Sequence, residues 1–156
     1  MVSLSATTSK NNPPLYDTTR MDNLTSSQIG KIGEYLTASV LGGYGLEVYM
    51  TDGKGFDILV MGDEAIRVDV KTTRSLSRSG GFHIKKGKTT AFRDFDPQDC
   101  DVFALVCLED SSLSFHRAED HAGKRKIYLN AGIHRATDPY ESWVTTVAAL
   151  RAKSSG

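Results

Sequence analysis

The sequence predicts an α/β domain in which helices flank a mixed central β-sheet. A helical pattern precedes three short runs with strand character, and the almost unbroken apolar run 102–108 predicts a further strand buried on both faces. A second capped helical pattern follows near the end of the chain. With 156 residues, the chain has the length of one well-buried domain, which we expect to span residues 23–153.

Composition favours an ordinary globular protein, with 39% hydrophobic and 24% charged residues. No apolar run approaches the roughly 18 residues of a membrane span, and the first residues lack the charged start and apolar stretch of a secretory signal. We therefore expect a cytoplasmic protein without a membrane partner. Cys100 and Cys107 have no metal-site spacing, which favours reduced, buried thiols.

The first element that we expect is a helix, preceded by a flexible arm. Residues 1–22 are rich in Ser, Thr, Asn and Pro and show no periodicity, so we expect the arm to cover them. Thr25 followed by Gln28 has the form of a capping box, and Gly42-Gly43 would end the helix. Its apolar positions recur at helical spacing at Ile29, Ile32, Leu36 and Val40.

Three strand-like runs follow, at residues 46–50, 56–60 and 66–71. The last two form a hairpin, and its register can be derived from the faces that it would create. A two-residue loop at 62–63 would leave apolar side chains on both sides of the hairpin. A three-residue loop at 62–64 instead gathers them on one face, in the pairs Phe56–Val70, Ile58–Val68 and Val60–Ile66.

The segment from Thr72 to Gln98 is rich in Gly, Ser and Lys, so we expect a mobile loop region there. The formal net charge of the chain is zero, yet residues 71–93 contain seven cations and no Asp or Glu. We interpret this segment as a strip that contacts DNA phosphates. Besides Lys71, its cations are Arg74, Arg78, Lys85, Lys86, Lys88 and Arg93.

Beyond the buried run, shorter strands are predicted near 113–116 and 126–129. A last helix is predicted to start at Asp138, which can cap it, with Pro139 at the first helical position. Trp143 then belongs to an apolar stripe and to the core. His83, His116, His121 and His134 are scattered along the sequence, and we expect surface or packing roles for them.

The favoured hairpin register places Asp57 directly across from Asp69, with about 5 Å between their Cβ atoms. Like charges at that distance repel, and strand alternation puts Lys71 on the same side as Asp69. A divalent cation would complete the balance, and carboxylate oxygens suit magnesium (Mg²⁺), for which Mn²⁺ can substitute. Such a site supports hydrolysis of a phosphodiester, with Lys71 orienting the nucleophile or neutralising the developing anion.

Two segments, Gly55-Phe56-Asp57-Ile58-Leu59-Val60 and Val68-Asp69-Val70-Lys71, resemble the motif strands of the PD-(D/E)XK nuclease superfamily. The helix with Glu34 resembles that of its Holliday-junction-resolvase-like branch, although Phe56 replaces the proline of the motif. The resemblance implies a restriction-endonuclease-like fold and a metal-dependent DNA endonuclease, in which Glu34 supports the site and Val70 is a further metal contact. Glu34 also lies off the centre of the apolar helix stripe, so a solvated position stays open.

The resemblance leaves the biological role open. A homing or phage-type endonuclease and a junction resolvase come first, with a restriction or repair enzyme behind them. Cleavage of both strands would require a symmetric homo-oligomer, a dimer or a tetramer. Two alternatives are a catalytically inactive DNA-binding module, whose carboxylates serve only structure, and an RNA nuclease.

Overall fold

A computed structural model describes residues 18–52, 55–76, 80–84 and 96–155. Its main sheet has the strand order β1-β2-β3-β5-β6, and only the β3–β5 pair is parallel. The predicted mixed sheet is therefore confirmed. Within the described ranges, no helix has the length and apolar character needed to cross a membrane. The strands are β1 (Glu47–Met50), β2 (Ile58–Met61), β3 (Ala65–Thr73), β5 (Val102–Cys107) and β6 (Ser112–Arg117).

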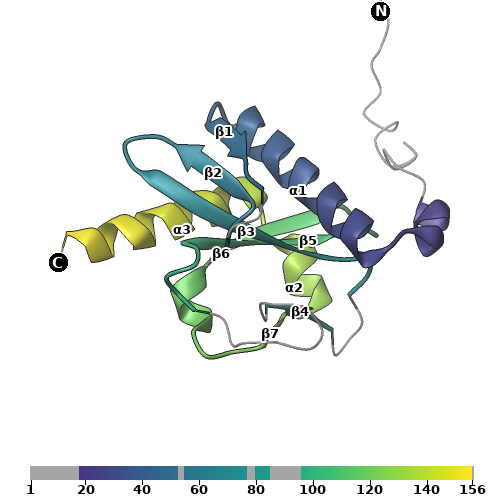
Figure 1. Cartoon of the computed structure of the whole chain (residues 1–156). Helices are drawn as coiled ribbons and strands as arrows, with labels where there is room; N and C mark the ends of the chain where they lie inside the picture. Colours follow the sequence, from purple (N-terminus) through teal and green to yellow (C-terminus); the bar gives the residue numbers. More distant parts are fainter. Residues whose placement is uncertain (1–17, 53–54, 77–79, 85–95, 156) are drawn as a thin grey trace, which may run out of the picture.

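Figure 1 shows how the remaining elements cover the two faces of this sheet. Helix α1 (Ser26–Gly43) lies on one face, and its apolar side chains join the core cluster that contains Val68 and Val70. On the other face lie helix α2 (Ala131–Ala136) and a two-stranded ribbon of β4 (Gly81–His83) and β7 (Lys126–Tyr128). A second core cluster, which includes Phe103 from β5, lies beneath the ribbon.

Helix α1 starts as predicted, since the Thr25 hydroxyl accepts from the Gln28 N–H and the Gln28 side chain accepts from the Thr25 N–H. Its most buried line is Gly33, Thr37 and Leu41 rather than the predicted apolar stripe, whose residues flank this line half-buried. The reason is steric. Gly33 has no side chain, so the helix backbone approaches Thr72 of β3 too closely for any larger residue.

The β2–β3 hairpin has the predicted register, with Ile58 opposite Val68 and Val60 opposite Ile66. Phe56, however, does not oppose Val70 on the apolar face and packs against the second core cluster instead. The Asp57 N–H donates to the Val68 carbonyl, which is one residue away from the partner that the β2–β3 register would give it. The regular pairing therefore does not extend to Phe56. A shift of one residue turns a side chain to the opposite face of a strand.

Two expectations about loops were wrong in their described parts, since residues 77–79 and 85–95 of the expected loop region lie outside the described residues. The Thr72–Gln98 segment contains β4, and Leu76, Phe82 and Ile84 are buried in the second cluster; the pattern Phe82-x-Ile84 was the strand signal in this Gly- and Lys-rich stretch. Of the arm expected over residues 1–22, residues 1–17 lie outside the described residues. The rest enters the 3-10 helix η2 (Thr18–Asn23), where Met21 is buried because its side chain packs into the first core cluster.

Helix α3 (Pro139–Ser154) closes the outer edge of the sheet beside β6. Asp138 caps it as predicted, with its carboxylate accepting from the Tyr140 and Glu141 N–H groups. Two α3 hydroxyls satisfy the backbone of Phe115: Ser142 accepts from its N–H at 3.0 Å and Thr146 donates to its carbonyl at 3.1 Å. An edge strand that would otherwise invite pairing with another chain is thereby covered.

The close approach at Gly33 predicts a specific cost. In Gly33→Ala the new Cβ would lie 1.8 Å from Thr72 Oγ1 and 2.9 Å from Thr72 Cβ, so α1 must move away from β3. We expect the free energy of unfolding, measured by urea denaturation, to fall by about 1 to 3 kcal/mol.

Gly30→Ala is the matched control in the same helix, because no atom lies within 4 Å of a Cβ built there. We expect it to raise stability by about 0.5 to 1 kcal/mol through helix propensity. Equal effects of the two substitutions would contradict the packing described for Gly33.

Candidate active site

Asp57 and Asp69 meet at the mouth of the β2–β3 hairpin. Asp69 belongs to β3 and is only 2% exposed, whereas Asp57 directly precedes β2. The Asp57 carboxylate accepts from the Val70 N–H at 2.8 Å. Its backbone carbonyl accepts from the Thr51 N–H at 2.9 Å, so both ends of the residue are held. The hairpin therefore brings the two predicted carboxylates together.

Their proximity changes the ionisation of Asp57. Burial and the negative charge of Asp69 raise the pKa of Asp57 from 3.8 to about 7, and protonated Asp57 can donate a hydrogen bond to Asp69. The Val70 N–H opposes this shift, because it stabilises the ionised carboxylate. A positive charge beside the two carboxyl groups would therefore stabilise their ionised forms.

Lys71 supplies part of that charge. Its Nζ lies 3.1 Å from Asp69 Oδ1, and its side chain is 19% exposed, so the ammonium group reaches the surface beside the buried carboxylate. The predicted placement of Lys71 on the same side of β3 as Asp69 agrees with this contact.

Glu34 of α1 reaches the same region. Its side chain is only 15% exposed, and its charge contributes to the raised pKa of Asp57. The reason lies in the packing of α1, since Glu34 is about 60° around the helix from the centre of the buried Gly33–Thr37–Leu41 line. The solvated alternative considered for Glu34 therefore does not describe its position.

Lys31 and Thr51 belong to this site although sequence reasoning missed both. Lys31 Nζ donates to Glu34 at 2.6 Å, and the negative charges of Glu34 and Asp57 raise the pKa of Lys31. Spacing of three residues on a helix was the available signal for this pair. Thr51 also donates its hydroxyl to the Phe56 carbonyl at 2.6 Å, which fixes the chain before Asp57.

The donor set fits a magnesium ion better than a softer metal. Three carboxyl groups, from Glu34, Asp57 and Asp69, lie near two ammonium groups, from Lys31 and Lys71. The acidic groups outnumber the basic ones, so a cation could still be bound. In the described part of the chain, no three His, Cys, Asp or Glu side chains are placed to hold a metal together. Mg²⁺ does not need three, because it typically binds one or two carboxylates and keeps several waters. Asp57 and Asp69 would be these ligands, and Val70 has its backbone carbonyl to offer.

Of the predicted DNA-contacting strip, the structure places Arg74 beside Asp22 of η2, with 3.1 Å between guanidinium and carboxylate. This surface pair leaves the Arg74 side chain 41% exposed. The other predicted cations, Arg78, Lys85, Lys86, Lys88 and Arg93, lie outside the described residues.

The histidines are less scattered than the sequence indicated. Two of them flank Ser114, whose hydroxyl lies 2.7 Å from His116 Nε2 and 3.1 Å from His134 Nδ1, and the His121 ring meets the His116 ring edge-on. Burial lowers the pKa of His116 to about 4. These side chains serve packing, as expected, and His83 is exposed.

Comparisons with known proteins agree with this architecture. No protein-family model matches the chain, and no curated protein sequence matches it significantly. The bacterial homing endonuclease I-Ssp6803I is similar in structure, with a TM-score of 0.64 and 13% identity over 84% of this chain and 99% of that one. A Holliday junction resolvase from Archaeoglobus fulgidus has a TM-score of 0.46 and 12% identity over 67% and 86% of the two chains. The predicted fold, a mixed sheet flanked by helices, is thus shared with the homing endonuclease.

The raised pKa of Asp57 predicts a pH-dependent stability in metal-free buffer. Because the folded state holds the Asp57 proton more tightly than the unfolded state, this contribution is complete below about pH 4 and is lost as pH rises through 7. Asp57→Asn removes the titration. We expect the free energy of unfolding of Asp57→Asn, relative to that of the wild type, to rise by on the order of 2 to 3 kcal/mol between pH 4 and pH 8, as measured by urea denaturation in EDTA.

Asp63→Asn is the control, because Asp63 sits in the hairpin turn with its side chain 94% exposed. Its stability difference from wild type should stay flat with pH. A flat difference for Asp57→Asn as well would mean that Asp57 ionises freely.

Proposed function

We propose that this protein is a magnesium-dependent DNA endonuclease that hydrolyses phosphodiester bonds. Its active site would contain Asp57, Asp69 and Lys71. The observation that carries the proposal is the acidic pair of Asp57 and Asp69, in which burial and the charge of Asp69 raise the pKa of Asp57 to about 7, with an ammonium group 3.1 Å from Asp69. Two carboxylates that repel each other destabilise a fold unless a bound cation neutralises them. Carboxylates with strongly shifted pKa values are therefore typical of functional sites.

Each residue has a role that follows from its position. Asp57 and Asp69, with the carbonyl of Val70, would hold the Mg²⁺ ion, and Glu34 with its partner Lys31 borders the site and can orient a water molecule. Bound there, the metal would lower the pKa of water and stabilise negative charge on the phosphate. Lys71, held by Asp69 and open to solvent, can neutralise the charge that develops on the phosphate oxygens.

DNA is the substrate that we propose, because the fold is shared with a homing endonuclease over nearly all of that protein. We include in the proposal a homing-type role, with junction resolution, restriction and repair as alternatives, and a homo-oligomer for cleavage of both strands. Residues 71–93, which contain cations but no acids, supply the charge that a DNA-binding surface needs.

The proposal is tested by incubating the protein with long duplex DNA, a four-way junction and single-stranded RNA, each with Mg²⁺, Mn²⁺ or EDTA. We expect cleavage of duplex DNA with either metal and none in EDTA. Asp69→Asn should lower the rate at least about a hundredfold. Lys71→Ala should lower it by about 10²- to 10³-fold, because it removes a charge that stabilises the transition state.

Asp63→Asn, the exposed turn variant, should cut DNA at the wild-type rate. Cleavage that persists in Asp69→Asn would point to a contaminating nuclease. DNA affinity without metal-dependent cleavage would favour the catalytically inactive DNA-binding module instead. Faster cleavage of RNA than of DNA would mean that the protein is an RNA nuclease.

A further inference from the structure

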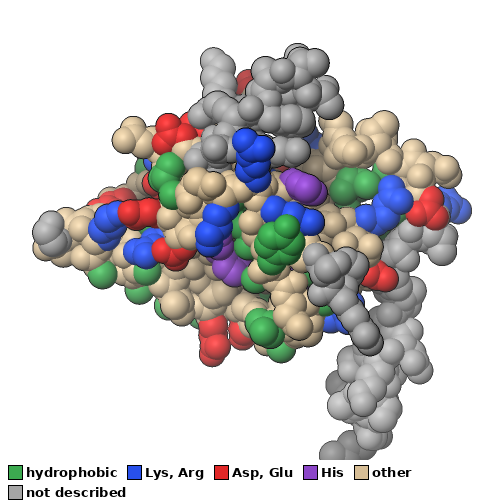
Figure 2. Space-filling view, turned by 90° about the horizontal axis from the view of Figure 1, so that it is seen from below, with side chains coloured by type: hydrophobic (Ala, Val, Ile, Leu, Met, Phe, Trp, Pro, Cys, Tyr) green, Lys and Arg blue, Asp and Glu red, His purple; other side chains and the backbone are tan. Residues whose placement is uncertain are grey.

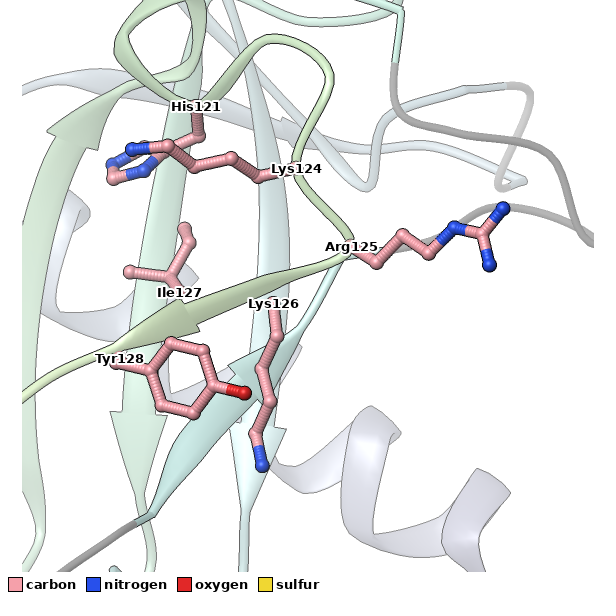
Figure 3. Close-up of a pocket in the computed structure, with 6 residues that line it drawn as sticks. All are labelled: His121, Lys124, Arg125, Lys126, Ile127 and Tyr128. Atoms are coloured by element: carbon pink, nitrogen blue, oxygen red, sulfur yellow. The ribbon is translucent and has the colours of Figure 1, made fainter.

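A basic hollow lies on the β4–β7 ribbon, outside the site described above. It is open to solvent and is lined by residues of β7 and the turn before it. Figure 3 shows these side chains, with Lys126 running alongside the Tyr128 ring and Arg125 pointing away from both. The lining residues are His121, Lys124, Arg125, Lys126, Ile127 and Tyr128.

Alternation along the ribbon separates an inner face from an outer one. Phe82 and Ile127 oppose each other and are buried in the second core cluster. Tyr128, by contrast, is 70% exposed, and its cross-strand partner is Gly81. The ribbon thus presents cations and an aromatic ring outward.

Two acidic residues near this hollow form ion pairs with cations outside it. Glu119 forms an ion pair with Lys153, and Asp120 pairs with Arg117 at 2.6 Å, so the nearby acids are engaged elsewhere. Among the described residues, no carboxylate oxygen lies within 4.0 Å of the Lys124 ammonium group, although the charges of Lys124 and Asp120 still attract each other. Figure 2 shows Lys and Arg side chains gathered on the face of the molecule seen from below. Such a surface attracts a polyanion.

Gly81 shapes the outer face of the ribbon. A Cβ at Gly81 would lie 2.5 Å from the Ile127 carbonyl oxygen and 2.8 Å from Lys126 Cε. Its absence lets the Lys126 stem cross the ribbon, where its ammonium group lies 5.1 Å from the centre of the Tyr128 ring. The cation and the ring form one unit, and tyrosine and lysine are both common contacts of DNA phosphates.

The ribbon is also close to the acidic site. Phe56, next to Asp57 in sequence, packs against the same core cluster as Phe82 and Ile127. The Ile84 N–H donates to the Arg125 carbonyl at 3.1 Å, which ties this basic segment to the strip predicted at 71–93, since Ile84 belongs to that strip. This hydrogen bond continues the β4–β7 pairing by one residue and joins two segments about forty residues apart in the sequence.

We propose that the β4–β7 ribbon is a second DNA-contacting surface, on which Lys124, Lys126 and Tyr128 bind the phosphate backbone of duplex DNA. This inference rests on the proposed function for its ligand. It adds contacts from a part of the chain whose sequence gave no such indication, and it makes the ribbon an extension of the cleavage site.

The test measures affinity for a fluorescent DNA duplex by anisotropy, in Asp69→Asn protein so that cleavage does not interfere. We expect Lys124→Ala/Lys126→Ala to weaken binding about tenfold at low salt and to lower the slope of log affinity against log salt by about 2. Tyr128→Ala should also weaken binding. Lys124→Arg/Lys126→Arg keeps the charge and should retain the affinity.

Arg151→Ala/Lys153→Ala is the control with the same loss of charge, located on α3 and exposed. Equal affinities of the two alanine doubles, or no DNA binding by any of the proteins, would overturn the ribbon proposal. Absence of cleavage by the wild-type enzyme would overturn the endonuclease proposal alone, because the binding difference between the doubles does not depend on catalysis.

Discussion

Repulsion between Asp57 and Asp69 is the constraint around which this domain is built. The hairpin register brings the two carboxyl groups together, and a shift by one residue would turn the apolar side chains of one strand away from the core. Burial prevents water from screening them, so the pKa of Asp57 rises to about 7. Hydrophobic packing thus stabilises an arrangement of charges that is unfavourable by itself, and a divalent cation would relieve it.

The two layers of the fold bring different groups to that pair. On one face, Gly33 lets α1 approach β3, and this close packing carries Glu34 and Lys31 to the acidic site. On the other face, the β4–β7 ribbon covers the second core cluster and presents an outer surface rich in positive charge. The groups proposed to bind the metal and those proposed to bind DNA are therefore positioned by different elements, which pack on opposite faces of the main sheet.

Local sequence patterns predicted much of this structure, because caps, glycine stops and alternation act over a few residues. The capping box at Thr25 and the hairpin register were found in this way. Strand β7 was predicted near 126–129, but β4 and α2 were not, since elements of three to six residues are stabilised by tertiary contacts rather than by propensity. The inward position of Glu34 likewise depends on the close approach at Gly33, which an apolar periodicity count does not detect.

The central claim, that Asp57 and Asp69 share one cation, is tested most directly by crystals grown with Mn²⁺ and measured for its anomalous scattering. The account predicts a single strong peak between the two carboxylates, within about 2.3 Å of an oxygen from each, and no peak there in Asp69→Asn crystals. The account would be contradicted if wild-type crystals at neutral pH showed no such peak and Asp57 and Asp69 were still hydrogen-bonded to each other.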